Sequence, residues 1–186
     1  PADQTLAELK EILQKAAWAK QKVLCPAFAI GRAQLLLSVL AEIVRDGVTP
    51  DIPIYLDSPL AIRASEVYLR YVEQLDDDAR TLVKSGQLRR DLHSLRPLLT
   101  PAQSRELNEQ WDPCVVIAGS GMCDGGRIMH HLRHNLWRRG VQVLLTSYMA
   151  EGTLGRRLVD GAEKVRIFRE DVVVRASVHT VNGLSA

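Results

Sequence analysis

Short apolar runs alternate along the chain with longer stretches in which apolar residues recur every three or four positions. The short runs are typical of buried strands and lie at 22–28, 53–56, 95–99, 114–118, 141–147, 165–168 and 172–181. The longer stretches predict helices at 5–20, 32–45, 59–71, 76–84, 101–109, 126–137 and 153–159. Thr5 and Glu8 fit a capping box for the first helix, and the polar, basic stretch 86–96 is predicted to be a loop.

This alternation predicts an α/β fold with a Rossmann-like, mainly parallel sheet flanked by helices. Strands joined through helices are nearly always parallel, with right-handed crossovers. The loops that follow the strands should therefore emerge at one edge of the sheet, where open α/β sheets bind ligands. Four loops are expected to meet there, at residues 27–34, 56–61, 119–127 and 147–155.

Composition narrows the class of protein without identifying its partner. The 186 residues are 46% hydrophobic and 25% charged, which suits one globular domain and excludes disordered, collagen-like and disulfide-scaffold classes. The 24 basic and 22 acidic residues give a net charge of +2, too small for a uniformly basic surface. The three cysteines show no CxxC spacing, so a cytoplasmic protein is expected. No apolar run reaches the length of a membrane span, so no membrane association is expected.

The segment GSGMCDGGR, residues 119–127, contains the most distinctive loop. Its glycines, between a strand and a helix, would allow close backbone approach and leave helix N–H groups free for an anion. The spacing matches neither the Walker A pattern nor GxGxxG, so tight strand-to-helix packing is the favoured alternative to phosphate binding. Cys123 is expected to be a buried small hydrophobe, with a lowered pKa near the helix start as the alternative.

Other polar residues on the loop edge have both structural and binding interpretations. Asp57 and Ser58 precede a helix that begins at Pro59, so they cap that helix or bind a ligand, and capping is favoured. Arg32 stands at a helix start, where a cation opposes the macrodipole. Its charge has no obvious structural benefit there, which favours contact with an anion.

Two histidines, His130 and His134, lie four residues apart and would share one helical face. They form an incomplete zinc site, because no carboxylate or thiol stands at a matching spacing. Four arginines disfavour a dication nearby: Arg127, Arg133, Arg138 and Arg139. A basic face close to a bound polyanion is therefore favoured over a metal site, and an ordinary solvated face stays open.

Five segments together resemble the β-CASP domain of metallo-β-lactamase-fold ribonucleases, in particular those of prokaryotic RNA-processing enzymes. They are PAFAIGRAQ, IYLDSPLA, VVIAGSGMCDGGRIMHHLRHNLW, AEGTLGRRLVDGA and RASVHTVNGLSA. The resemblance covers almost the whole chain and preserves the order of the segments. Leu184, where phenylalanine is usual, and Ser147-Tyr148-Met149, where Gly-Tyr-Gln is common, depart from the family pattern.

The resemblance implies that residues 1–186 are a single β-CASP insertion domain excised from a larger protein. In the family this domain caps a metallo-β-lactamase domain of the same polypeptide, and RNA runs between the two. The two zinc ions belong to the metallo-β-lactamase domain, whose HxHxDH motif is absent here. No metal ligand and no cofactor is therefore expected in this chain. The family histidine of FSAHAD would follow directly after Ala186.

The resulting hypothesis is an RNA-binding cap of a zinc-dependent ribonuclease that uses metal-activated water, with the isolated fragment inactive. The residues expected to contact phosphate or RNA are Arg32, Ser58, Ser120, Gly121 and Tyr148, with Arg127 and His130 as secondary candidates. Three alternatives stay open: a mononucleotide-binding domain, a module that docks another protein domain, and the β-CASP domain of a DNA-end nuclease. Endonuclease versus exonuclease action and a homo-oligomeric parent also stay open.

Overall fold

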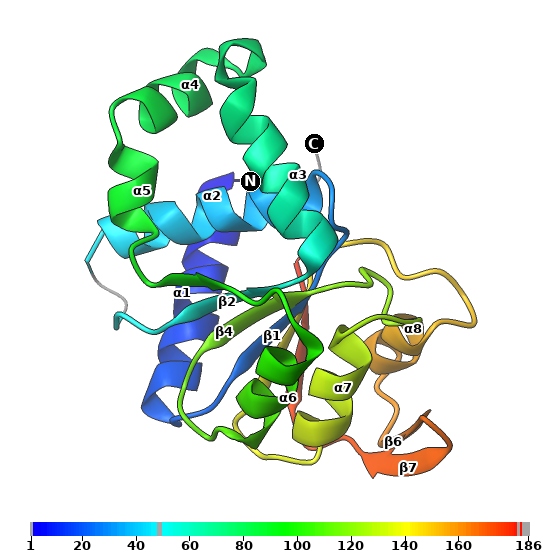
Figure 1. The fold of residues 1–186 in the computed structure, drawn as a ribbon. Coiled ribbons are helices and arrows are strands. Elements are labelled where there is room, and N and C mark those ends of the chain that lie inside the picture. The colour runs from blue at the N-terminus through cyan, green and yellow to red at the C-terminus, as the bar shows by residue number, and fades with distance from the viewer. Residues whose placement is uncertain (1, 48–49, 182, 184–186) are drawn as a thin grey trace.

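Parallel strands form the centre of the molecule (Figure 1). The computed structural model describes residues 2–47, 50–181 and 183. Within these residues a six-stranded sheet has the order β3-β2-β4-β1-β5-β8, and every neighbouring pair is parallel. The strands are β1 (Val23–Pro26), β2 (Ile54–Asp57), β3 (Leu95–Pro97), β4 (Val115–Ala118), β5 (Gln142–Leu145) and β8 (Ser177–Thr180). The predicted α/β class with a mainly parallel sheet is confirmed.

Helices cover both faces of this sheet (Figure 1). They are α1 (Ala2–Trp18), α2 (Arg32–Arg45), α3 (Pro59–Arg70), α4 (Asp77–Lys84), α5 (Gln87–Asp91), α6 (Pro101–Glu109), α7 (Ile128–Asn135) and α8 (Leu154–Val159), with a 3-10 turn at Val72–Gln74. The central strand β4 shows how the buried side chains divide between the two faces of the sheet. Val115 and Ile117 pack in the core with α1 and α2, whereas Val116 and Ala118 pack in the core with α7 and α8. Successive strand residues point to opposite faces, so β4 contributes to both cores.

The predicted capping box at the first helix is wrong. Helix α1 begins at Ala2, and Thr5 lies inside it with only 7% of its surface exposed. A residue at this depth belongs to the buried stripe of the helix, which also carries Leu9 and Ile12. The capping pattern therefore arose by chance within a helix that starts earlier.

The stretch 86–96, predicted to be a loop, contains helix α5 and the start of β3. The polar sequence of this stretch indicated a loop, but a buried charged residue holds it in a helix. Asp91 is 5% exposed and accepts hydrogen bonds from Arg45 Nε at 2.9 Å and from Arg45 Nη2 at 2.6 Å. Gln87 Nε2 donates to the same carboxylate at 2.5 Å. A contact with α2, far away in sequence, thus stabilises a helix that its local pattern does not indicate.

The expected last strand, 172–181, is two strands in different sheets. Strand β7 (Glu170–Val173) pairs antiparallel with β6 (Lys164–Ile167) in a separate ribbon. Phe168 and Arg169 join them with positive φ angles of 49° and 68°, as a tight hairpin turn requires. The backbone N–H groups of Arg175 and Ala176 then donate to Leu136 O, and the chain continues into β8.

Some sequence features lie outside the described residues or concern membranes. Leu184, one of the departures from the family pattern, falls in the undescribed range 184–186. Within residues 2–47, 50–181 and 183, no helix combines the length and the apolar character needed to cross a membrane.

Candidate nucleic-acid interface

The carboxyl edge of the sheet carries a depression of about 530 Å³, here called the loop-edge depression. Because the strands are parallel, the loops after β1, β2 and β4 meet at this edge. The lining comes from residues 27–29, 57–60, 119–121 and 126–127. Four predicted contact residues line it: Ser58, Ser120, Gly121 and Arg127. The structure thus brings together residues that are up to 69 positions apart in sequence (127 − 58).

The other three predicted residues lie around this depression or away from it. Arg32 is partly exposed and begins α2, directly after the loop that follows β1. Tyr148 follows β5 and is 73% exposed. His130 lies on the outer face of α7, where its ring packs against Phe168 with ring centroids 4.6 Å apart. His130 therefore belongs to a different surface from the loop edge.

Ser58 is the N-cap of α3, as the sequence favoured. Its hydroxyl accepts a hydrogen bond from the backbone N–H of Ala61 at 3.2 Å, and Pro59 occupies the first helical position. An N-cap side chain satisfies one of the N–H groups that a helix start leaves unpaired. Ser58 also lines the loop-edge depression, so capping fixes its position at the edge of the sheet.

Asp57 is fully buried and binds three side chains from two helices and their flanks. Ser104 Oγ of α6 donates to it at 2.5 Å, and His131 Nε2 of α7 donates at 2.6 Å. Arg127 Nη1, immediately before α7, donates at 2.6 Å. Burial alone raises the pKa of Asp57, but the hydrogen bonds from His131, Ser104 and Arg127 outweigh it and hold the pKa below its usual value. The carboxylate is therefore charged and ties β2 to both helices.

Arg127 has a structural role that the sequence did not indicate. Besides Asp57, its guanidinium donates to the carbonyl oxygens of Leu98 at 3.0 Å and Leu99 at 3.1 Å. It thus connects the start of α7 to the end of β2 and to the segment after β3. Its side chain remains 19% exposed and lines the loop-edge depression.

The glycine-rich loop after β4 is closed on itself by its own backbone. Ser120 N donates to Gly125 O at 3.0 Å, and Ser120 Oγ bonds the Asp124 carboxylate and accepts from Gly125 N at 3.2 Å. A Cβ on Gly126, whose φ is +72°, would lie 2.4 Å from Gly119 O. Close packing of the loop, rather than an open cradle, therefore explains the requirement for glycine.

The structure contradicts the expected free N–H groups of this loop and confirms the expected burial of Cys123. The N–H groups of Ile128 and Met129, at the start of α7, donate to Gly119 O and Gly126 O, so they are not free for an anion. Cys123 is fully buried, and burial raises the pKa of its thiol to about 12, with Asp124 adding to the effect. The alternative of a lowered thiol pKa is thereby excluded, and Cys123 is a small buried hydrophobe.

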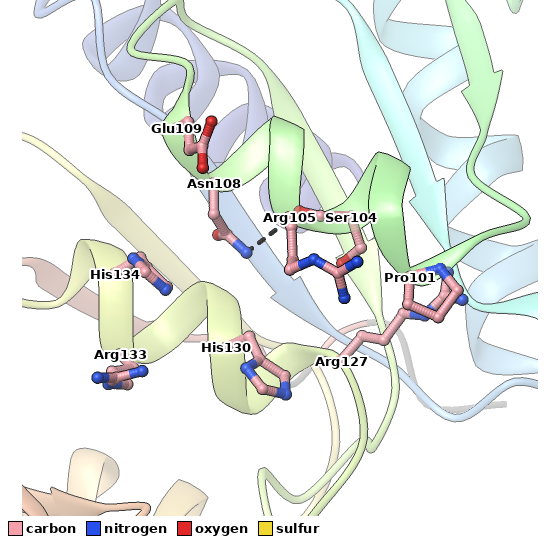
Figure 2. Close-up of a pocket in the computed structure, with 9 residues that line it drawn as sticks. All are labelled: Pro101, Ser104, Arg105, Asn108, Glu109, Arg127, His130, Arg133 and His134. Carbon is pink, nitrogen blue, oxygen red and sulfur yellow. Dashed lines mark hydrogen bonds between the residues drawn. The ribbon is translucent and has the colours of Figure 1, made fainter.

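A second hollow, here called the α6–α7 groove, lies between two helices on one face of the sheet (Figure 2). It has a volume of about 460 Å³. Its lining residues are Pro101, Ser104, Arg105, Asn108, Glu109, Arg127, His130, Arg133 and His134. His130 and His134 share this face of α7, as their spacing predicted, while His131 points into the core toward Asp57.

The histidines of this groove do not provide a metal site. Within the part of the chain that the structure describes, no group of three or more His, Cys, Asp or Glu residues is placed to hold a metal ion. Three arginines line the groove alongside His130 and His134, and a dication would be repelled by them. The described residues therefore do not fit the zinc ions that the family resemblance implies.

Sequence reasoning missed the interactions of Asp57 with His131 and Ser104. The distance along the chain, 74 residues between Asp57 and His131, hides the pair from any local pattern. One signal was present, because His131 falls on the same stripe of α7 as the buried residues Ile128 and Leu132. A histidine in a buried stripe needs a polar partner, and an aspartate at the end of a buried strand can supply it.

Comparison with known proteins gives one family. A family model for the Beta-Casp domain matches residues 33–158. The chain is 38% identical over 185 residues to Ribonuclease TTHA0252 of Thermus thermophilus, and the match covers 100% of this chain and 42% of that protein. It is 32% identical over 175 residues to an RNase J-like protein of Methanocaldococcus jannaschii, covering 94% of this chain and 38% of that protein. It is also 31% identical over 141 residues to the transcription termination factor FttA of Methanosarcina mazei, and the match covers 75% of this chain and 22% of that protein.

Replacing Asp57 with asparagine should destabilise the chain by about 3–5 kcal/mol, because Arg127 would lose the carboxylate that compensates its charge. Since the pKa of Asp57 is lowered by folding, its stabilising contribution is complete above about pH 4 and is lost as the pH falls through the folded-state value. Urea unfolding at pH 7 and at lower pH measures both effects. The gap between the unsubstituted chain and Asp57→Asn should narrow in acid. The exposed Asp78→Asn is the control, and an equal loss in both variants would contradict the role of Asp57.

Two neighbouring glycines provide a matched test of the closed loop. Gly126→Ala should lower the free energy of unfolding by more than about 1 kcal/mol, because the residue has a positive φ and the new Cβ would meet Gly119 O. Gly125→Ala should change it by no more than about 0.5 kcal/mol, since nothing lies within 4 Å of the added atom. Urea unfolding of both variants at neutral pH makes the comparison. Equal stability of the two would show that the loop is open rather than closed.

Proposed function

Since this chain belongs to the Beta-Casp domain family, we propose that it is the RNA-binding cap of a ribonuclease. In this proposal the chain positions the RNA backbone over a metal site on another domain of the same polypeptide. The observation that carries it is the loop-edge depression, where the loops of three strands meet beside exposed apolar side chains. A nuclease or RNA-processing role agrees with the names of the relatives, two of which are called ribonuclease or RNase J-like.

The exposed residues around the depression support contact with a partner. Phe28 is 43% exposed, Leu60 is 58% exposed and Tyr148 is 73% exposed. Large apolar side chains gathered at one edge of a soluble domain indicate an interaction surface. Aromatic side chains stack on unpaired bases in most sequence-tolerant RNA sites. In our proposal Tyr148 stacks on a base, and the apolar rim around Phe28 and Leu60 rests against the metallo-β-lactamase domain.

The catalytic part of the proposed enzyme lies elsewhere. The chain spans about two fifths of the length of the first two relatives, 42% and 38%. Zinc ions held by the other domain would supply the activated water and the Lewis acid. The residues of this chain would bind and orient the substrate. Holding a reacting group in one geometry is itself worth several kcal/mol of barrier, so a cap of this kind contributes to rate without touching the reacting atoms.

The rigid arrangement behind the depression suits this orienting role. Asp57 and Arg127 fix the end of β2 and the start of α7, and Ser58 is held as a helix cap. Arg32, at the start of α2, and Tyr148 are the side chains proposed to reach the phosphate backbone and a base. Mononucleotide binding by the glycine loop has no comparable support, because the helix N–H groups it needs are already bonded.

Removing the exposed aromatic ring of Tyr148 should weaken RNA binding by about 1–3 kcal/mol, the range for loss of one base-stacking contact. The measurement is fluorescence anisotropy of a labelled 12-nucleotide oligouridylate titrated with Tyr148→Ala and with the unsubstituted chain. Tyr71→Ala is the matched control, because Tyr71 is 53% exposed and follows α3 rather than the loop edge. Equal weakening in both variants would contradict a specific role for Tyr148.

The division between cap and catalytic domain has its own test. The 186-residue chain, incubated with RNA and added zinc, should give no cleavage products above background, whereas the parent protein should give them. A chelator should abolish cleavage by the parent. The readout is gel electrophoresis of end-labelled RNA. Zinc-dependent cleavage by the chain alone, lost on substitution of loop-edge residues, would place the catalytic centre here and overturn the proposal.

A further inference from the structure

Most residues that line the α6–α7 groove have charged or polar side chains, above the apolar residues that the two helices bury in the core. On α6 the lining residues Ser104, Arg105 and Asn108 follow a helical stripe, and on α7 His130 and His134 do the same. Figure 2 shows the side chains of the two helices facing one another across the hollow. Neighbouring helices normally bury an apolar stripe between them. A hollow of about 460 Å³ between such residues is large enough to receive part of a nucleotide strand.

The charge of the groove favours an anion. Arg105, Arg127 and Arg133 line it, against a single acidic residue, Glu109. The carboxylates that bind two of these arginines approach from outside the lining: Asp57 lies buried beneath Arg127, and Glu170 belongs to β7. Arg105 is exposed, and it lies close enough to His130 for its charge to lower the pKa of that histidine.

The two histidines of the groove also favour an anionic ligand. Burial is the main cause that lowers the pKa of His130 and of His134, and the charge of Arg133 lowers both further. Both rings are therefore neutral at pH 7 and can donate one hydrogen bond and accept another. Cations that disfavour a further positive charge in the groove attract a negative one.

Asn108 supplies an acceptor that is still unused. The residue is 9% exposed, and its Nδ2 donates to Ser104 O at 3.2 Å. Its Oδ1 is buried and has no hydrogen-bond partner among the described residues. Buried acceptors are rarely left unpaired in folded proteins. A free phosphate ion has little to donate to it, whereas a nucleotide can offer a ribose hydroxyl or a base N–H along with its phosphate.

The groove shares Arg127 with the loop-edge depression and ends near exposed aromatic rings. Arg127 lines both the loop-edge depression and the groove. From there α7 extends for eight residues, about 12 Å. Beyond the carboxyl ends of α6 and α7 stand Trp111 and Trp137, 61% and 45% exposed, with ring centroids 6.0 Å apart. The Arg138 guanidinium lies over the Trp111 ring, 3.9 Å from its centroid. Cations and aromatic rings in succession are typical of single-strand nucleic-acid tracks.

We propose that the α6–α7 groove is a second binding site for the substrate strand, which receives the sugar-phosphate backbone of a single strand as it leaves the loop edge at Arg127. This inference rests on the proposed function and adds a path outside the space between the two domains. Arg105 contacts a phosphate, His130 and His134 donate to backbone oxygens, and Asn108 accepts from the nucleotide. Glu109 opposes the backbone and limits the affinity of the groove.

The test uses two substitutions of opposite expected effect on one helix. Arg105→Gln should weaken binding of a labelled 12-nucleotide oligouridylate roughly fivefold at 0.1 M salt, and should reduce the slope of log K against log salt by about 0.7, the value for one lost phosphate contact on a single strand. Glu109→Gln should tighten binding. Fluorescence anisotropy at several salt concentrations gives both quantities. Weaker binding by Arg105→Gln could also result from misfolding, whereas tighter binding by Glu109→Gln could not. The second variant therefore keeps the test valid if the first one does not fold.

Matched controls and a second probe complete the design. Glu106→Gln removes an exposed acid of α6 that does not line the groove, and Arg89→Gln removes an exposed cation of α5; neither should change the affinity or the salt slope. An oligodeoxyuridylate of equal length is the second probe. Because Arg105 is proposed to contact a phosphate, Arg105→Gln should weaken binding of RNA and of DNA by the same factor, and a loss confined to one of them would contradict a backbone contact.

The outcomes distinguish this inference from the proposed function. Suppose that Arg105→Gln and Glu109→Gln leave the affinity and the salt slope unchanged while Tyr148→Ala weakens binding. This result would overturn the proposed binding site in the groove and leave the proposed function of the loop edge in place. Equal shifts in the groove variants and in their controls would also overturn it, because the effect would then follow net charge alone. If neither oligonucleotide binds the unsubstituted chain at the lowest salt, both proposals fail.

Discussion

The buried carboxylate of Asp57 is the interaction on which the candidate interface depends. A charge at this depth is costly unless it is paired and hydrogen-bonded, and here a serine, a histidine and an arginine donate to it. The three donors come from α6, from α7 and from the residue before α7, so the carboxylate fixes the relative position of those helices and the end of β2. The same helices form the walls of the α6–α7 groove. One ionic contact thus sets the geometry of two separate surfaces.

This arrangement separates the residues that hold the loop edge together from those that can reach a ligand. The glycine loop uses its backbone N–H groups and the Ser120 hydroxyl to close on itself, so it offers shape more than free donors. In the proposed function, recognition falls to exposed side chains such as Tyr148 and to the partly exposed Arg127. A rigid frame with a few exposed contacts loses little conformational entropy on binding, which is an advantage for a domain that must orient a flexible strand.

The sequence predicted the fold and part of the loop-edge geometry, because both depend on local patterns. The buried strands have period-two and continuous apolar patterns, and Pro59 indicated the cap at Ser58; both are local signals, and both are confirmed. The partnership of Asp57 with His131 and the anchoring of α5 by Arg45 and Asp91 depend on contacts between distant segments, which local patterns do not contain. The glycine content of the loop after β4 predicted free N–H groups at the start of α7. These groups are bonded instead, because the path of the loop brings Gly119 O and Gly126 O next to them.

The small net charge of +2 is compatible with the two proposed nucleic-acid surfaces, because two of the arginines concerned are paired with carboxylates outside the groove. Arg127 is bound to Asp57 and Arg133 to Glu170, so each keeps a fixed orientation while the groove itself contains one acid. Guanidinium groups that are already held in one orientation lose little conformational entropy when they bind a phosphate. This small entropy cost partly compensates for the electrostatic attraction that the neighbouring carboxylates cancel. Such sites bind a strand moderately and with strong salt dependence. That behaviour suits a processing enzyme, whose substrate must move along the surface and leave it after each turnover.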